Sequence, residues 1–179
     1  MPSQLVDIGA NLTHSSFQHD ISDVLGRARE HDVARIVVTG ADERGVHDAH
    51  ADFIACMDNV RGRVGQAVVH CFTGTKDELF DYLDRDFFIG ITGWICDERR
   101  GTHLRELVAS IPADRLMLET DAPYLLPRDV RPMPSHRRNE PMYLAHICAE
   151  VARNRGEDVA ATAAQTATTA TRFFALAAA

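Results

Sequence analysis

The sequence of 179 residues has no apolar run near the roughly 18 to 20 residues that a membrane-spanning helix needs. It begins Met1-Pro2-Ser3-Gln4, without a basic segment and a following apolar stretch, so no signal peptide is expected. It also lacks a CxxC pair, and its cysteine spacing predicts neither a zinc knuckle nor a disulfide framework. We therefore expect a cytoplasmic protein without a membrane partner, in which Cys71 and Cys96 are reduced core thiols.

A net positive charge is absent as well. The net charge of -7 argues against a generally basic nucleic-acid binder. It does not exclude a nuclease, because a metal site can hold phosphate locally on an acidic protein. Positive charge does gather in one proline-rich segment, which contains Arg128, Arg131, His136, Arg137 and Arg138. These side chains either meet a phosphate backbone or are simply solvated.

The remaining composition is ordinary for a globular domain, with 45% hydrophobic and 25% charged residues. The length predicts one domain over residues 1–179, long enough to bury a core. Nothing repeats at a fixed short period, so a solenoid is excluded.

Strand and helix patterns alternate along the chain. This alternation predicts βαβ units, a parallel sheet and the α/β class. The expected strands are residues 5–10, 35–40, 66–72, 87–91 and 115–119, and the expected helices are 20–32, 43–57, 76–85, 102–110, 142–155 and one from 158 onward. We expect Phe173, Phe174 and Leu176 to dock the last helix into the core.

Two motifs follow apolar strands directly. His70-Cys71-Phe72-Thr73-Gly74 follows Ala67-Val68-Val69, and Glu119-Thr120-Asp121-Ala122-Pro123-Tyr124 follows Leu116-Met117-Leu118. Metal-binding side chains at the carboxyl ends of parallel strands are typical of α/β-barrel active sites. His70 and Asp121 together favour a divalent-cation site, although a single histidine in this position is more often structural.

These motifs resemble the TatD family of metal-dependent deoxyribonucleases. Residues 7–12, 90–101, 123–129 and 137–141 resemble further family segments. The resemblance implies a (β/α)8 barrel of TIM type and a metal-dependent hydrolase that acts on ester bonds of DNA. It further implies a 3′-5′ exonuclease whose partners are single-stranded DNA or 3′ ends, with RNA as an alternative. Mg²⁺ is the expected cation, with Mn²⁺ or Zn²⁺ as alternatives.

The resemblance makes His70 and Asp121 the metal-site and catalytic residues. Asp121 would also orient or deprotonate the attacking water. Glu119 would point to the same side, either supporting the ligands or held as a core acid by an arginine. Substrate binding is expected from Asn11, Trp94, Arg128, Arg138, Asn139 and Glu140. For Trp94 the alternative is core packing, and for Asn11 it is capping of the next turn.

The chain departs from the family pattern between residue 57 and residue 65. Three βα units of the family are missing there, and with them two of the four metal ligands that the family carries. About five parallel βα units remain, which predicts an incomplete barrel in the strand order second, first, eighth, seventh, sixth. We expect an open or pinched arc whose second and sixth strands are edges, which favours homo-oligomers. The alternative is that these two strands meet through the joint 61–65.

Two function classes follow. The chain is either a TatD-like exonuclease, impaired by the missing units, or an inactive truncated relative that binds nucleic acid or a partner chain. Bound metal with at least three protein ligands would separate the two.

Overall fold

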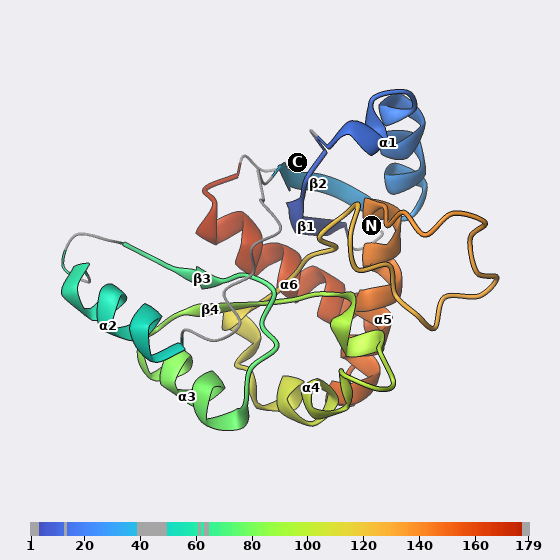
Figure 1. The fold of residues 1–179 in the computed structure, drawn as a ribbon. Helices are drawn as coiled ribbons and strands as arrows, with labels where there is room; N and C mark the ends of the chain where they lie inside the picture. The colour runs from blue at the N-terminus through green and yellow to red at the C-terminus, as the bar shows by residue number, and fades with distance from the viewer. Residues whose placement is uncertain (1–3, 13, 39–49, 61, 63–64, 177–179) are drawn as a thin grey trace.

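The computed structural model describes residues 4–12, 14–38, 50–60, 62 and 65–176 (Figure 1). Among these residues, five parallel strands form one sheet in the order β2-β1-β5-β4-β3. The strands are β1 Leu5–Ala10, β2 Val33–Val38, β3 Val68–Val69, β4 Phe88–Ile91 and β5 Leu116–Leu118. The predicted α/β class and the predicted strand order are both confirmed. Within the described residues the sheet is open, with β2 and β3 at opposite edges, as expected, and the alternative in which these two strands meet is not found.

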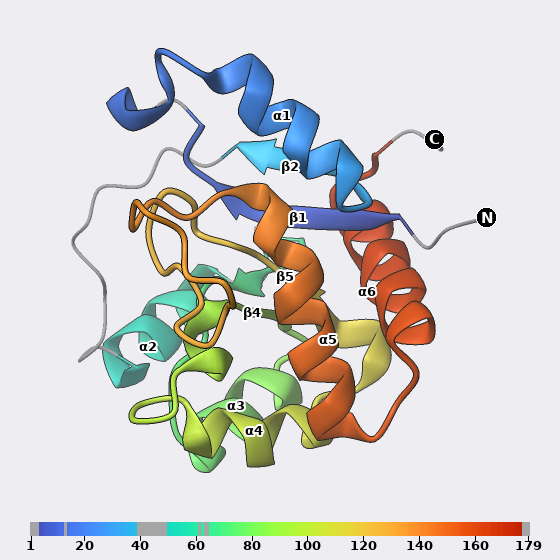
Figure 2. The ribbon, with the colours of Figure 1, turned by 90° about the vertical axis from the view of Figure 1, so that its right-hand side faces the viewer.

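In the part of the chain that the structure describes, six α-helices connect and cover the strands (Figures 1 and 2). They are α1 Ile21–Glu30, α2 His50–Val60, α3 Lys76–Asp84, α4 Thr102–Leu107, α5 Leu144–Arg155 and α6 Val159–Phe173. Local sequence explains several ends. Thr75 and Glu78 form a capping box at the start of α3, and Asp158 accepts from the backbone of Ala161 at the start of α6. Gly156 ends α5 in the left-handed region, with φ of 68°.

Several element boundaries differ from the prediction. β3 has only two residues instead of the expected 66–72, because it is an edge strand that pairs with β4 alone. β2 starts and ends two residues earlier than expected. α2 begins at His50, and residues 43–49 of the expected helix lie outside the described residues. Of the expected joint 61–65, only Gly62 and Gly65 are described.

The two faces of the sheet are covered by different helices. Ile89 and Leu116 belong to the larger core cluster, which also includes residues of α3, α4 and α5. Phe88 and Met117 point to the opposite face, where the end of α6 covers them. The Phe173 ring lies 4.9 Å from the Phe88 ring, so the predicted docking of the C-terminal segment is confirmed. Among the described helices, none combines the length and the apolar character required to cross a membrane.

Candidate metal centre

Three side chains converge at the carboxyl edge of the sheet. His70 directly follows β3, whereas Glu119 and Asp121 follow β5. His70 Nε2 lies 2.9 Å from Asp121 Oδ1, and His70 Nδ1 contacts Glu119 Oε2. The expected proximity of His70 and Asp121 is therefore confirmed. The donor atoms of all three residues lie within 4.8 Å of one another.

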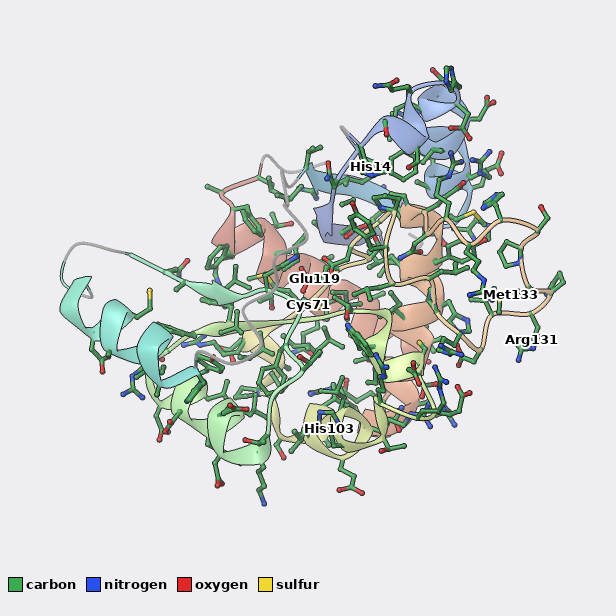
Figure 3. All side chains as sticks on the ribbon, viewed as in Figure 1. His14, Cys71, His103, Glu119, Arg131 and Met133 are labelled. Atoms are coloured by element: carbon green, nitrogen blue, oxygen red, sulfur yellow. The ribbon has the colours of Figure 1, made fainter. Side chains whose placement is uncertain are left out.

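Glu119 occupies a slot between the strands that flank β5. Its side chain is fully buried, and its Oε1 accepts a hydrogen bond from the backbone N–H of Cys71 (Figure 3). A Cβ at Gly9 of β1 would come within 2.7 Å of Glu119 Oε2, and one at Gly90 of β4 within 2.5 Å of Oε1. The carboxylate fits because both neighbouring strands carry glycine at its level.

The role of Glu119 was left open by the sequence, and its contacts now decide between the alternatives. Within the described part of the chain no arginine pairs with it; its partners are His70 and the backbone of Cys71. It is therefore a direct member of the cluster and not an arginine-held core acid.

Electrostatics in the cluster favour a positive charge between the two carboxylates. Burial lowers the pKa of His70, but hydrogen bonds and charges from Asp121 and Glu119 outweigh it and raise that pKa to about 10. Burial raises the pKa of Glu119. One imidazole holding two carboxylates requires a proton on each ring nitrogen, or a cation in place of a proton.

Asp7 supports the segment that carries the cluster. It is fully buried in β1, and it accepts hydrogen bonds from the Thr120 backbone N–H (2.9 Å), the Thr120 hydroxyl (2.6 Å) and the Gly9 backbone N–H (3.1 Å). Burial raises the pKa of Asp7 to about 7, against these hydrogen bonds. The sequence predicts no specific role for Asp7, although it is an acidic side chain inside an apolar strand.

The donor set suits a divalent cation. Two carboxylates and one imidazole are ligands that Mg²⁺, Mn²⁺ and Zn²⁺ accept in proteins. The glycine slot also fixes Glu119 while leaving Asp121 and His70 partly accessible, with 15% and 41% of their side chains exposed. The residues present therefore fit a metal centre of three protein ligands.

Two of the expected substrate-binding residues hold the backbone next to this cluster. The Asn139 amide donates to the carbonyls of Thr120 (2.7 Å) and Tyr124 (2.6 Å), and Asn139 is fully buried. The backbone N–H of Asn11 donates to the Ala122 carbonyl at 2.7 Å. Both residues thus anchor the chain on either side of Asp121.

Arg138 and Glu140 belong to the long loop after β5, residues 119–140. Together with Asp20 and Arg27 they form a group of ion pairs, here called the clamp, that joins this loop to α1. Arg138 pairs with Asp20 and Glu140, and it also donates to the Ser16 carbonyl. Arg27 of α1 pairs with Glu140 at 2.7 Å. The clamp borders a cavity of about 550 Å³, lined by Asp20, Arg27, His136, Arg138, Glu140, Met142 and Tyr143. Arg138 thus forms hydrogen bonds with three protein residues, which is the arrangement of a structural arginine.

The other two expected residues lie around the short 3₁₀ helix η3, Gly93–Cys96. Trp94 is partly buried, with the Arg100 guanidinium 5.7 Å from its ring centroid. Arg128 is 49% exposed and lies 3.7 Å from Asp97. Arg131 bonds carbonyls of its own loop and lies with Met133 on the outer part of that loop (Figure 3). The arginines that are close in sequence therefore diverge in space.

Comparison with known proteins places the chain in a family. The sequence model described as "TatD related DNase" matches residues 45–175, and the chain belongs to this family. A protein of Citrobacter koseri named 3'-5' ssDNA/RNA exonuclease TatD is 60% identical over 111 residues, which are 62% of this chain and 43% of that protein. A protein of the same name from Erwinia tasmaniensis is 58% identical over 127 residues, 71% of this chain and 49% of that protein. The chain spans about half the length of these curated relatives.

Solved structures agree on the fold. A TatD-family hydrolase from Entamoeba histolytica aligns over 96% of this chain and 98% of its own, with a TM-score of 0.78 and 17% identity. The TatD homologue YJJV from Escherichia coli aligns over 99% and 100%, with a TM-score of 0.82 and 16% identity. The five-stranded sheet is therefore part of a barrel-like architecture of TatD hydrolases.

Proposed function

We propose that this chain hydrolyses phosphodiester bonds of single-stranded DNA or RNA from the 3′ end, using a divalent cation held by His70, Glu119 and Asp121. The convergence of these three side chains at the carboxyl edge of the sheet carries the proposal. The names of the relatives support the substrate class. Mg²⁺ is the cation that we expect, with Mn²⁺ or Zn²⁺ as alternatives.

The roles of Asp121 and Glu119 follow from how far each side chain is buried. A bound divalent cation would polarise the phosphodiester and make water a stronger acid. Asp121 is partly exposed, so its carboxylate can orient a water molecule and accept its proton. Glu119 is buried and accepts a hydrogen bond from the Cys71 backbone N–H, so its carboxylate would be a cation ligand of fixed position. Asp7 and Asn139 hold the backbone of Thr120, the residue between Glu119 and Asp121.

Substrate contacts are expected outside this cluster. Arg128 is half-exposed and can reach a phosphate, which would position the strand. The ring of Trp94 can stack on a base, which is worth roughly 1–3 kcal/mol in single-strand binding. Asn11 and Arg138 would contribute by shaping the loop that carries Arg128.

A second candidate is an inactive relative that binds nucleic acid or a partner chain. The observation that favours it is the pairing of both His70 nitrogens with carboxylates, which protons on the ring can provide without a metal ion. The open edges at β2 and β3 would then serve a second copy or another chain.

A degradation assay separates the two candidates. A 5′-labelled single-stranded oligonucleotide should be shortened stepwise from its 3′ end in the presence of Mg²⁺ or Mn²⁺, and a chelator should stop the reaction. The exonuclease proposal is wrong if the pure protein binds no divalent cation and leaves the oligonucleotide intact. Stoichiometric cation binding without cleavage would support a binding protein that keeps the metal centre.

A further inference from the structure

A second group of metal-ligand residues lies away from the first cluster. Cys96 ends η3, Asp129 lies in the long loop after β5, and His146 lies in α5. Donor atoms of the three residues lie within 4.8 Å of one another. His146 Nε2 is 2.7 Å from Asp129 Oδ1. Three segments that are separate in sequence thus bring one thiol, one carboxylate and one imidazole to one place.

The chemistry of this donor set differs from that of the first cluster. A thiolate is a soft ligand, and together with imidazole and carboxylate it suits Zn²⁺ better than Mg²⁺. Cys96 is a free, fully buried cysteine. A nucleophilic role does not fit it, because reactive thiols are partly exposed and have a low pKa.

Two carboxylates act on the Cys96 thiol. Burial raises the pKa of the Cys96 thiol far above its usual range, and the carboxylates of Asp129 and Glu150 raise it further. Arg105 opposes this effect, but Glu150 is itself held by Arg153, Arg105 and Asn154. A divalent ion reverses the balance, since a thiol that coordinates a metal is deprotonated.

Zinc binding would need only small movements of the three side chains. Zinc bonds of about 2.0–2.3 Å in a tetrahedron place neighbouring ligand atoms about 3.3–3.8 Å apart. His146 and Asp129 would separate slightly and the thiol would approach. The Asp129 and His146 side chains are 38% and 36% exposed, so both can adjust while Cys96 stays fixed in η3.

We propose that Cys96, Asp129 and His146 bind a Zn²⁺ ion that fastens the long loop to η3 and α5. On binding, the Cys96 thiol releases its proton to solvent and the sulfur coordinates the ion. A water molecule would complete the tetrahedron on the exposed side. Because Arg128 and Trp94 flank this position in the loop and in η3, the ion would also fix their relative placement.

Cobalt substitution tests the proposal. The full chain is stripped of metal, kept reduced with a non-thiol reductant and titrated with Co²⁺. A near-ultraviolet band from sulfur-to-cobalt charge transfer should appear and saturate, and Zn²⁺ should displace it. Cys96→Ser should abolish the band. His146→Ala, which alters a partly exposed side chain, should weaken Co²⁺ binding at least about tenfold and keep the native circular dichroism.

Three controls assign the signal. Cys71→Ser, next to the first cluster, and Cys148→Ser, another buried thiol, should both keep the band. Asp121→Asn should keep it too, because this site is independent of the proposed nuclease centre. A wild-type protein without the band, a band that survives Cys96→Ser, or unchanged affinity in His146→Ala would each overturn the proposal.

Discussion

His70 and Asp121 touch across a strand that lies between theirs: His70 Nε2 is 2.9 Å from Asp121 Oδ1, although β4 separates β3 from β5. Gly90 makes this possible, because β4 carries no side chain at the level of the contact. A Cβ there would come within 2.5 Å of Glu119 Oε1 and 3.3 Å of the Val69 carbonyl oxygen. The cluster therefore depends on the absence of a side chain at Gly90 of β4.

Asp121→Ala should reduce cation-dependent nuclease activity by about 10²–10⁴-fold, the range for losing a positioned proton acceptor. The variant should also lose affinity for the divalent cation, because one of three donors is gone. Asp114→Ala is the matched control, since Asp114 is an exposed aspartate that pairs with Arg115. Activity that survives both a chelator and Asp121→Ala would show that cleavage comes from another site.

Gly9→Ala should disturb the metal centre although it replaces none of the proposed ligands. Its Cβ would lie 2.6 Å from His70 Cε1 and 2.7 Å from Glu119 Oε2, so we expect a loss of stability of about 1–3 kcal/mol. Cation affinity, measured by calorimetry, should fall as well. Gly26→Ala in α1 meets no atom within 4 Å and should stabilise the chain by up to about 1 kcal/mol. Equal effects of the two variants would contradict the slot around Glu119.

Arg128 and Arg138 should behave differently when replaced. Arg128→Ala should weaken nucleic-acid binding and flatten its dependence on salt, because Arg128 is half-exposed. Arg138→Ala should instead lower the melting temperature, because it leaves the buried Glu140 with Arg27 as its remaining ion-pair partner. We expect the free energy of unfolding to fall by about 1–3 kcal/mol, which lowers the melting temperature by several degrees. The assignment fails if Arg138→Ala changes only binding, or if Arg128→Ala changes only stability.

The clamp should make stability depend on pH in the acid range. Burial raises the pKa of Glu140, but hydrogen bonds from Arg27 and Arg138 outweigh it and hold that pKa below its usual value. The folded state therefore binds fewer protons than the unfolded state. This contribution is present above the unfolded pKa and is lost as pH falls through the folded pKa. Urea unfolding between neutral and acid pH should show a smaller change in stability for Glu140→Gln than for wild type. An unchanged pH profile would refute the clamp.

The open sheet should favour self-association through its edges. Val38 at the end of the edge strand β2 is 52% exposed, and unpaired edges recruit further strands. Val38→Lys should shift the chain toward monomers in analytical ultracentrifugation. Met133→Lys changes a similarly exposed residue of the long loop and should have no effect. A wild-type chain that stays monomeric at high concentration would remove the basis for an oligomer.

The sequence by itself determined the class of fold, the number of strands and the position of the two motifs. Apolar runs and turn residues are local signals, so residues 5–10 and the carboxyl-end placement of His70 and Asp121 were predictable from them. The resemblance added the strand order. The boundaries of β3 were not predictable, because the length of an edge strand depends on its single partner.

Only the tertiary structure decided which polar residues meet. Glu119 turned toward His70 because Gly9 and Gly90 flank it, a relationship among three strands. Arg138 turned toward Asp20 and Glu140, although its neighbours in sequence suggested a basic patch. Cys96 met Asp129 and His146 only because η3, the long loop and α5 pack together. The sequence determines which chemical groups are available. The distances between them, on which a site depends, result from packing between segments that are far apart in the sequence.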